Sequence, residues 1–217
     1  MIYQLRQMLE FKIFNIPVKV EPWFWIVLAL LGGAIGADSK SALLQILMFL
    51  AAGFISILVH ELGHALTARH FGHRVRILLH GFGGLAFYQG GGHTRKRTFL
   101  ITAAGPAIQI VLGLLALALF NQFGGMSRPT REFLWILYWI SFVWALLNLL
   151  PILPLDGGRL LESILGPGRI RLTLTISMAT AVLVCLLCLS SGRIFGAMLT
   201  GIFAYESYKG LRQLSYR

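Results

Sequence analysis

The five residues His60-Glu61-Leu62-Gly63-His64 form an HExxH motif. On a helix, its two histidines lie one turn apart and face the same way, so both imidazoles can bind one Zn²⁺ at about 2.0–2.1 Å. Glu61 then lies beside the metal, where its carboxylate can deprotonate a metal-bound water. The alternative is a pair of polar histidines on a surface helix. Because the motif directly continues the uncharged stretch 41–59, where ionisable side chains are costly and tend to mark function, metal binding is favoured.

A third zinc ligand is expected elsewhere in the chain, because a catalytic zinc site usually combines three protein ligands with a water. The chain contains two aspartates, Asp38 and Asp156. The membrane topology derived below places Asp156 at the same level as the two histidines and Asp38 on the opposite side. We therefore expect Asp156 to complete the site, with Glu162 as the alternative ligand. An ordinary helix-end aspartate is the structural alternative for Asp156.

The composition indicates a membrane protein. Of the 217 residues, 57% are hydrophobic and 12% are charged, whereas soluble domains carry about 25% charged residues. This apolar excess is too large for one globular core, and the length predicts a single domain over residues 1–217. The net charge of +11 arises from basic residues between apolar runs. Since they form no long stripe, we interpret them as topology determinants and expect a lipid bilayer, not nucleic acid, as partner.

Six apolar stretches predict the helices that cross the bilayer. A spanning helix needs about 20 predominantly apolar residues; four stretches satisfy this clearly and two are shorter. The expected spans are residues 22–37, 41–71, 98–123, 133–155, 172–191 and 194–209. With six spans, 15 of the 19 Lys and Arg residues fall on one side. By the positive-inside rule that side is cytoplasmic, and both termini lie on it.

Two segments outside these spans favour extended structure. Residues 13–20 alternate in part and contain Pro17, which predicts a short strand before the first span. Residues 75–89 are rich in β-forming side chains and are interrupted by Gly81, Gly83 and Gly84. This pattern predicts a hairpin or a glycine-kinked re-entrant segment. The expected fold is an all-α polytopic membrane protein with six transmembrane helices and a small β-hairpin element on the cytoplasmic side.

A second motif accompanies HELGH and strengthens the case for a protease. Residues 148–159 read Asn-Leu-Leu-Pro-Ile-Leu-Pro-Leu-Asp-Gly-Gly-Arg. The two motifs together closely resemble the site-2 protease family of intramembrane zinc metalloproteases. The Ala104-Gly105-Pro106 and Gly83-Gly84 steps are also similar to that family, and the resemblance covers residues 13–161. The chain departs from the family at Gln109, where an asparagine is common.

The resemblance implies an intramembrane endopeptidase with one Zn²⁺ held by His60, His64 and Asp156 and with Glu61 as the catalytic base. It also implies that the substrate is the transmembrane segment of another membrane protein. Family members often carry a PDZ or CBS domain, for which this chain has no room, so it resembles a minimal core. Such a core fits a multi-pass protein of a prokaryotic cytoplasmic membrane. The sequence carries no signal for an oligomeric state.

Several residues are candidates for binding the substrate. Asn148 can donate a hydrogen bond to the substrate or the intermediate, although an interhelical polar contact is its structural alternative. Residues Gly83, Gly84 and Leu85 begin the second half of the predicted hairpin. An open strand edge there can pair with an unwound substrate segment, and the glycines allow close backbone approach. A purely structural hairpin is the alternative.

Two other functions use the same residues. A metal transporter would need polar or ionisable side chains on several spans, but the stretches 98–123, 172–191 and 194–205 contain no acidic, basic or histidine residue in their interiors. A metal-dependent scaffold that binds transmembrane segments without cleaving them has no use for an intact HExxH motif. We therefore favour the zinc endopeptidase.

Overall fold

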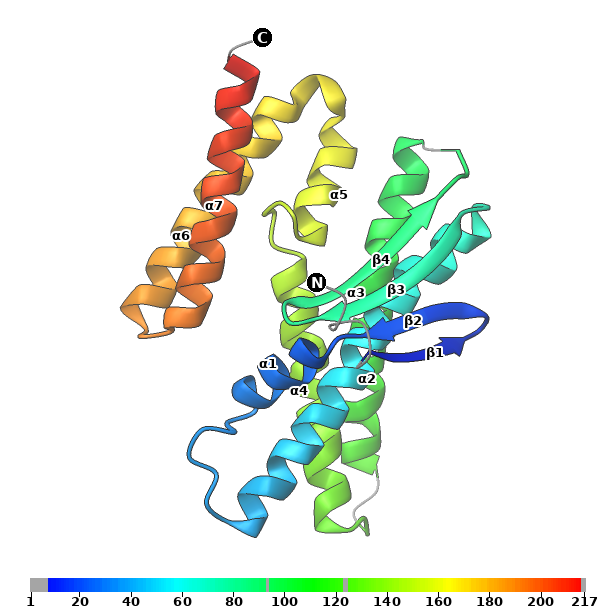
Figure 1. The fold of residues 1–217 in the computed structure, drawn as a ribbon, viewed down its shortest axis with the longest axis vertical. Coiled ribbons are helices and arrows are strands. Elements are labelled where there is room, and N and C mark those ends of the chain that lie inside the picture. Colours follow the sequence, from blue (N-terminus) through cyan, green and yellow to red (C-terminus); the bar gives the residue numbers. More distant parts are fainter. Residues whose placement is uncertain (1–7, 93, 123–124, 216–217) are drawn as a thin grey trace. The chain divides into compact units, whose positions relative to one another are not determined.

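A computed structural model describes residues 8–92, 94–122 and 125–215 of the chain (Figure 1). The chain divides into two compact units, residues 1–92 with 104–145 and residues 93–103 with 146–217. In chain order, the described elements are β1 (Leu9–Ile13), β2 (Ile16–Val20), α1 (Pro22–Leu31), α2 (Lys40–His70), β3 (Arg74–His80), β4 (Gly83–Gln89), α3 (Arg95–Gln122), α4 (Arg128–Asn148), α5 (Asp156–Leu165), a 3₁₀ turn (Pro167–Arg169), α6 (Ile170–Ser190) and α7 (Ile194–Ser215).

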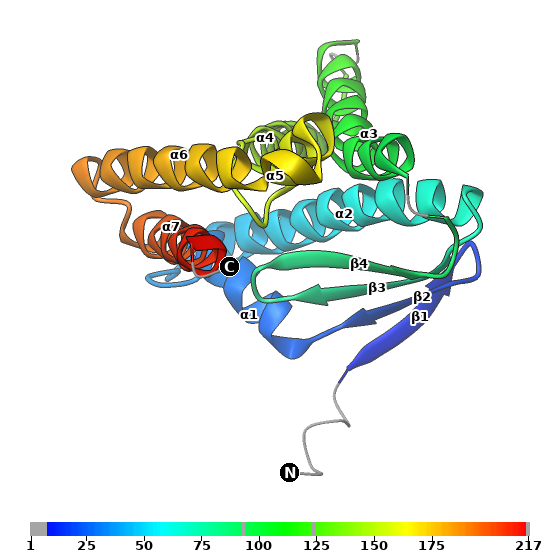
Figure 2. The same ribbon diagram turned by 90° about the horizontal axis from the view of Figure 1, so that it is seen from above.

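The first unit contains a four-stranded sheet in the order β1-β2-β3-β4. The outer pairs are antiparallel, whereas β2 and β3 run parallel, with Val18 opposite Ile77. Because side chains alternate between the faces of a strand, Ile16, Val18 and Val20 all lie on one face and are at most 1% exposed. They share a buried cluster with residues of α1 and α2. Figure 2 shows the sheet lying along α2, so β4 is held next to the helix that carries HExxH.

Helix α2 is the longest element of the first unit. It begins after Ser39, whose hydroxyl accepts a hydrogen bond from the Ala42 amide at 3.2 Å, as is typical of an N-cap. It ends at His70, before Gly72 with φ of +84°. Its 31 residues correspond to about 46 Å at 1.5 Å per residue. The helix can therefore cross an apolar layer of about 30 Å and still extend its last turns beyond it.

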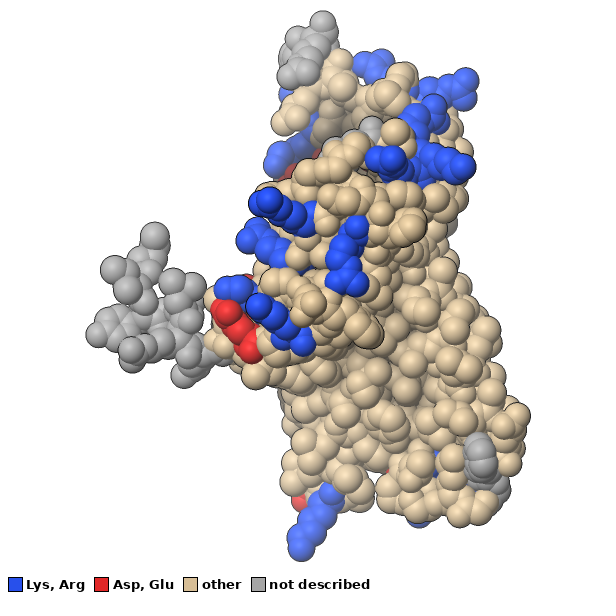
Figure 3. All heavy atoms as spheres, turned by 90° about the vertical axis from the view of Figure 1, so that its right-hand side faces the viewer, with Lys and Arg blue, Asp and Glu red and all other residues tan. Residues whose placement is uncertain are grey.

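Several helices have the length and apolarity that a membrane span requires. Among the described residues, these are α2, α3, α4 and the helical segment Pro167–Ser190. Their outward side chains are large and apolar; exposed examples are Leu47, Leu115, Leu183, Leu186 and Leu187. In Figure 3, Lys and Arg gather over one part of the face drawn, and a wide area of that face carries no charged atom. An exposed apolar surface of this kind is typical of contact with lipid, and the chain is an integral membrane protein.

The second unit is built around the antiparallel helices α6 and α7, which lie side by side (Figure 1). Its buried polar contacts reach the loop that precedes α5. The Ser177 hydroxyl of α6 accepts a hydrogen bond from the Leu153 amide at 2.8 Å and lies 2.8 Å from the Ser207 hydroxyl of α7. At the other end of α5, the Arg95 guanidinium donates to the carbonyls of Ser163 and Ile164. Both ends of α5 are thereby held within this unit.

The two segments expected to be extended contain strands in the structure, and one expected helix ends earlier than its apolar stretch. The hairpin over residues 75–89 is confirmed as β3 and β4, and the expected strand at 13–20 is β2 at the end of a β1–β2 hairpin. The helix expected over 133–155 differs: α4 ends at Asn148, and residues 149–155 form a loop. Pro151 and Pro154 lie in that loop, and proline supplies no amide hydrogen to a helix. The expected end of the span 98–123 lies outside the described residues.

The expected number of spans is supported in part. Four helical segments of the described chain meet the length and apolarity of a span. The stretch at 22–37 forms α1, which has 10 residues and is short for a spanning helix. The stretch at 194–209 lies within the 22-residue helix α7. The structure therefore shows a mostly helical membrane protein with a small sheet.

Candidate active site

His60 and His64 lie one turn apart on α2, and their side chains are 4% and 7% exposed. Their Nε2 atoms are 3.0 Å apart, and the ring planes are nearly perpendicular, at 83°. Two nitrogens that each bind one zinc ion at 2.0–2.1 Å cannot be more than about 4.2 Å apart. The observed separation satisfies this limit, so the two imidazoles fit one shared metal ion.

The space for the His64 ring depends on helix α3. Gly105 of α3 faces that ring, and a Cβ atom at this position would overlap it. Any side chain at position 105 therefore has to displace either His64 or the α3 backbone. The Ala104-Gly105-Pro106 step, noted in the sequence without a structural role, is thus where α3 approaches the metal-binding face of α2.

Glu61 follows His60 on α2 and is 4% exposed. It faces the beginning of β4, because a Cβ atom at Gly84 would overlap its carboxylate. Strand β4 is the last strand in the sheet order, so one of its edges is not paired with a strand among the described residues. The sheet therefore brings an unpaired strand edge next to the carboxylate predicted to be the general base.

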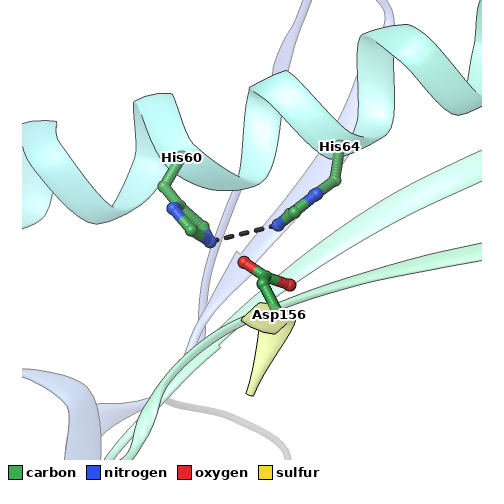
Figure 4. A group of neighbouring side chains, drawn as sticks. All are labelled: His60, His64 and Asp156. Atoms are coloured by element: carbon green, nitrogen blue, oxygen red, sulfur yellow. Dashed lines mark hydrogen bonds between the residues drawn. The ribbon is translucent and has the colours of Figure 1, made fainter. Parts of the chain in front are cut away.

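Asp156 is the first residue of α5, and it is 9% exposed. A carboxylate in the first turn of a helix is favoured by the helix dipole. Asp156 forms a group with His60 and His64 in which one ligand atom from each residue lies within 4.8 Å of the others. Figure 4 shows the Asp156 carboxylate directed toward the two imidazoles. This donor set of two nitrogens and one carboxylate oxygen is typical of catalytic zinc, and Glu162 does not belong to the group.

Three buried polar residues accompany the histidines, one on α2 itself and two on the helices α3 and α4. Gln109 of α3, Ser56 of α2 and Ser141 of α4 are all 0% exposed. The Gln109 carbonyl oxygen lies 2.9 Å from His60 Nδ1, and the Gln109 amide donates to the Ser56 hydroxyl at 2.9 Å. The sequence singled out Gln109 only as a departure from a family pattern, and it gave no role to the two serines. The signal that was available is a polar amide in the middle of the apolar part of this helix.

The predicted substrate-binding residues occupy two places. Gly83 and Gly84 begin β4 within the first unit, followed by Leu85, which is 38% exposed. Asn148 is the last residue of α4 and is half-buried. Because α4 stops there, the loop over residues 149–155 separates Asn148 from Asp156, whereas the expected span 133–155 would have continued as a helix up to Asp156. A binding role for these four residues stays a prediction.

Comparisons with known proteins show which protein family the chain resembles. The model of "Peptidase family M50" matches residues 124–190. The chain is 30% identical over 191 residues to Rip2 of Mycolicibacterium smegmatis, named as a candidate zinc metalloprotease, and the match covers 69% of this chain and 73% of that protein. The solved site-2 protease of Methanocaldococcus jannaschii superposes with a TM-score of 0.67 at 25% identity, covering 94% of this chain and 95% of that one. The chain belongs to the site-2 protease family.

This site-2 protease family member has longer relatives as well. It is 30% identical over 157 residues to a zinc metalloprotease of M. jannaschii, and this match covers 72% of the chain and 44% of the relative. It is 36% identical over 146 residues to the stage IV sporulation protein FB of Bacillus subtilis, covering 66% of the chain and 46% of that protein. The chain spans less than half the length of these two relatives. The resemblance found in the sequence is confirmed at the level of the family.

Proposed function

We propose that this chain is an intramembrane zinc endopeptidase that cleaves transmembrane segments of other membrane proteins. The observation that carries the proposal is the buried group of His60, His64 and Asp156, with Glu61 next to His60 in the same helix, in a chain of the site-2 protease family. The donor set and the 3.0 Å separation of the two imidazole nitrogens fit Zn²⁺. One zinc ion is expected per chain.

The chemistry divides between the metal and the protein. When bound, Zn²⁺ acts as a Lewis acid that polarises the peptide carbonyl and lowers the pKa of water to about 7. The Glu61 carboxylate accepts a proton from the attacking water as the carbon–oxygen bond forms. It then donates that proton to the amide nitrogen as the carbon–nitrogen bond breaks. Glu61 is suited to both transfers because it follows His60 directly in the helix and is shielded from solvent.

A helical substrate must unwind before this chemistry can reach its backbone. Unwinding in lipid exposes peptide groups, and each one that lacks a hydrogen bond costs several kcal/mol. We assign the compensating hydrogen bonds to the edge of β4, by strand addition. The edge is open among the described strands, and Gly84, the second residue of β4, contacts Glu61. A substrate strand paired along Gly83, Gly84 and Leu85 therefore passes close to the general base.

Asn148 is proposed as a further contact to the substrate. Its carboxamide can donate a hydrogen bond to the carbonyl oxygen that gains charge in the transition state. The position of Asn148 supports this role, because the residue ends α4 at the start of the loop that leads to Asp156. Residues on both sides of this loop then contribute to catalysis, Asn148 to the substrate and Asp156 to the metal.

The proposed setting is a prokaryotic cytoplasmic membrane with six spans and both termini in the cytoplasm. The distribution of 15 basic residues on one side and 4 on the other supports the orientation. The six spans would consist of the four long apolar helices together with α1 and α7. This topology places the zinc-binding end of α2 toward the cytoplasmic side.

The proposal is tested with purified protein in liposomes, by measuring bound zinc, zinc flux and cleavage of a co-reconstituted single-span substrate. The wild type should hold one zinc, produce no flux and cleave the substrate. Glu61→Gln preserves the side-chain shape but cannot act as a base, so it should keep its zinc and cleave about 10²–10⁴-fold more slowly.

The other two functions give different outcomes in the same experiment. Flux without cleavage would identify a transporter. Absence of both flux and cleavage, together with co-purification of the substrate from the same liposomes, would identify a scaffold. Cleavage by Glu61→Gln at the wild-type rate would contradict the assigned mechanism.

A further inference from the structure

Gln109 is a fully buried amide in the middle of a membrane-spanning helix. Burying an amide without hydrogen bonds costs several kcal/mol in an apolar medium, so the partners of this side chain indicate its role. One partner is His60, through its Nδ1 atom at 2.9 Å. The other is Ser56 one turn earlier on α2, through its hydroxyl at 2.9 Å and its carbonyl at 3.5 Å.

These partners determine which way the amide points. The Ser56 carbonyl can only accept a hydrogen bond, so the nitrogen of the Gln109 amide must face Ser56. The amide oxygen then faces His60 Nδ1, and because that oxygen is an acceptor, Nδ1 must carry the hydrogen. The Ser141 hydroxyl of α4 donates to the Ser56 hydroxyl at 3.0 Å. The orientation of the amide is therefore linked to three helices.

The state of His60 follows from this geometry. A neutral imidazole carries its hydrogen on one ring nitrogen and a lone pair on the other. With the hydrogen on Nδ1, the lone pair of His60 lies on Nε2, the atom that faces His64 Nε2 at 3.0 Å. The opposite tautomer would direct an N–H group at the position where a shared cation has to bind.

We propose that Gln109 is a positioning residue that holds His60 in its zinc-binding tautomer, and that Ser56 and Ser141 hold Gln109 in the required orientation. The inference rests on the proposed zinc site and adds to it a second layer of residues, none of which touches the metal. Such outer partners of ligating histidines typically change metal affinity by about 10- to 100-fold.

The length of the Gln109 side chain is part of this inference. Asparagine is shorter by one carbon–carbon bond of about 1.5 Å. At the observed separation of α2 and α3, an asparagine at position 109 cannot hold both the His60 and the Ser56 contacts at 2.9 Å. We therefore expect Gln109→Asn to weaken zinc binding even though the functional group is unchanged.

The test measures the zinc dissociation constant of the purified full chain by competition with a chelator, independently of proteolysis. Gln109→Leu removes the acceptor at nearly constant shape, and its affinity should fall by about 10- to 100-fold. Gln109→Glu keeps an acceptor for the His60 N–H and should retain most of the affinity. Ser141→Ala keeps the Gln109 contacts and removes only the hydrogen bond to Ser56, so its affinity should fall, but by less than that of Gln109→Leu.

Several results would overturn the inference. One is zinc binding by Gln109→Leu at wild-type affinity. Another is an equal loss in Gln109→Glu, because this variant keeps both the side-chain shape and an acceptor for the His60 N–H, and the acceptor would then not be what supports zinc binding. ¹⁵N NMR of the histidine rings in metal-free wild type gives an answer even if a variant fails to fold: hydrogen on His60 Nδ1 is expected, and hydrogen on Nε2 contradicts it. Tight zinc binding without substrate cleavage would reject the proposed protease and leave this inference standing.

Discussion

At the scale of single residues, the site consists of ionisable side chains and the glycines that make room for them. His60, Glu61 and His64 are all less than one-tenth exposed, and in their helix they follow the uncharged stretch 41–59. Gly105 leaves space for the His64 ring, and Gly84 leaves space for the Glu61 carboxylate. The positions of His64 and of the Glu61 carboxylate therefore depend on the missing side chains of Gly105 and Gly84 as much as on the residues of α2.

The assignment of Asp156 as third ligand gives the first residue-scale prediction. Removing its carboxylate in Asp156→Ala should weaken zinc binding by more than about 100-fold. Mutating a residue that only contacts a zinc ligand already lowers metal affinity by about 10- to 100-fold. The measurement is the zinc dissociation constant of the purified protein. Asp38→Asn is the matched control, since Asp38 is exposed and lies outside the group. Unchanged zinc affinity in Asp156→Ala would move the third ligand to another residue.

The close approach at Gly105 gives a second prediction. Gly105→Ala adds one methyl group that overlaps the His64 ring, and overpacking of this kind costs about 1–3 kcal/mol. If the histidine moves to relieve the overlap, zinc affinity should fall by about 5- to 150-fold. Gly201→Ala on α7 is the control, because a Cβ there meets its nearest neighbour at an ordinary 3.8 Å. Equal zinc affinity in both variants would show that the α3 backbone moves to relieve the overlap and that His64 keeps its position.

Sequence patterns identified the candidate metal ligands that the structure groups together, but not the partners of these residues. The i, i+4 spacing of two histidines fixes their common helix face without any knowledge of the fold. The contacts of Gln109 with His60 and Ser56 depend on which faces of α2 and α3 meet, and this apposition is set by the close approach of the helix backbones. The periodicity of residues within one helix does not show which faces of two helices meet.

At the scale of elements, Asp156 follows a loop that interrupts the helical structure after Asn148. It does not lie at the end of one continuous helix. Uncharged residues continue past Asn148, so composition alone predicted a longer helix. Pro151 and Pro154 end it, and the loop is held through the Leu153 amide by Ser177 of α6. Hydropathy does not distinguish an apolar loop from an apolar helix, and this explains the difference between the expected and observed ends of α4.

Strand β4 is the element that links the fold to the proposed substrate. The sequence predicted the hairpin because glycines interrupt a β-rich segment. Its position beside Glu61 depends on the sheet packing along α2, which the sequence did not reveal. An edge strand with exposed Leu85 and Phe87 is a ready partner for an extended segment.

The strand-pairing proposal predicts a substrate-dependent defect. Leu85→Pro or Phe87→Pro removes one backbone N–H donor from β4. Each variant should cleave a stable helical substrate more slowly than one that already contains helix-breaking residues, because only the former needs hydrogen bonds to stay unwound. The measurement is the ratio of the two cleavage rates, with zinc content checked in the same samples. An equal loss on both substrates, or no loss on either, would count against strand addition.

At the scale of the whole molecule, the chain combines an exposed apolar surface with a buried group of ionisable side chains whose proposed chemistry requires water. Exposed leucines cover the long helices, whereas His60, Glu61 and His64 are buried. Composition and charge distribution were sufficient to predict a multi-pass membrane protein. They did not fix the number of spans, because α1 is short and α7 carries both apolar and charged residues.

The most direct test of the account is to find where the protein cuts its substrate. Wild-type protein and a single-span substrate are reconstituted together in liposomes with zinc, and the product termini are identified by mass spectrometry. Glu61→Gln in parallel liposomes identifies cleavage by any contaminating protease. The account predicts termini inside the apolar segment of the substrate, present with the wild type and absent with the variant. Termini confined to the flanking soluble regions, or the same products with Glu61→Gln, would contradict it.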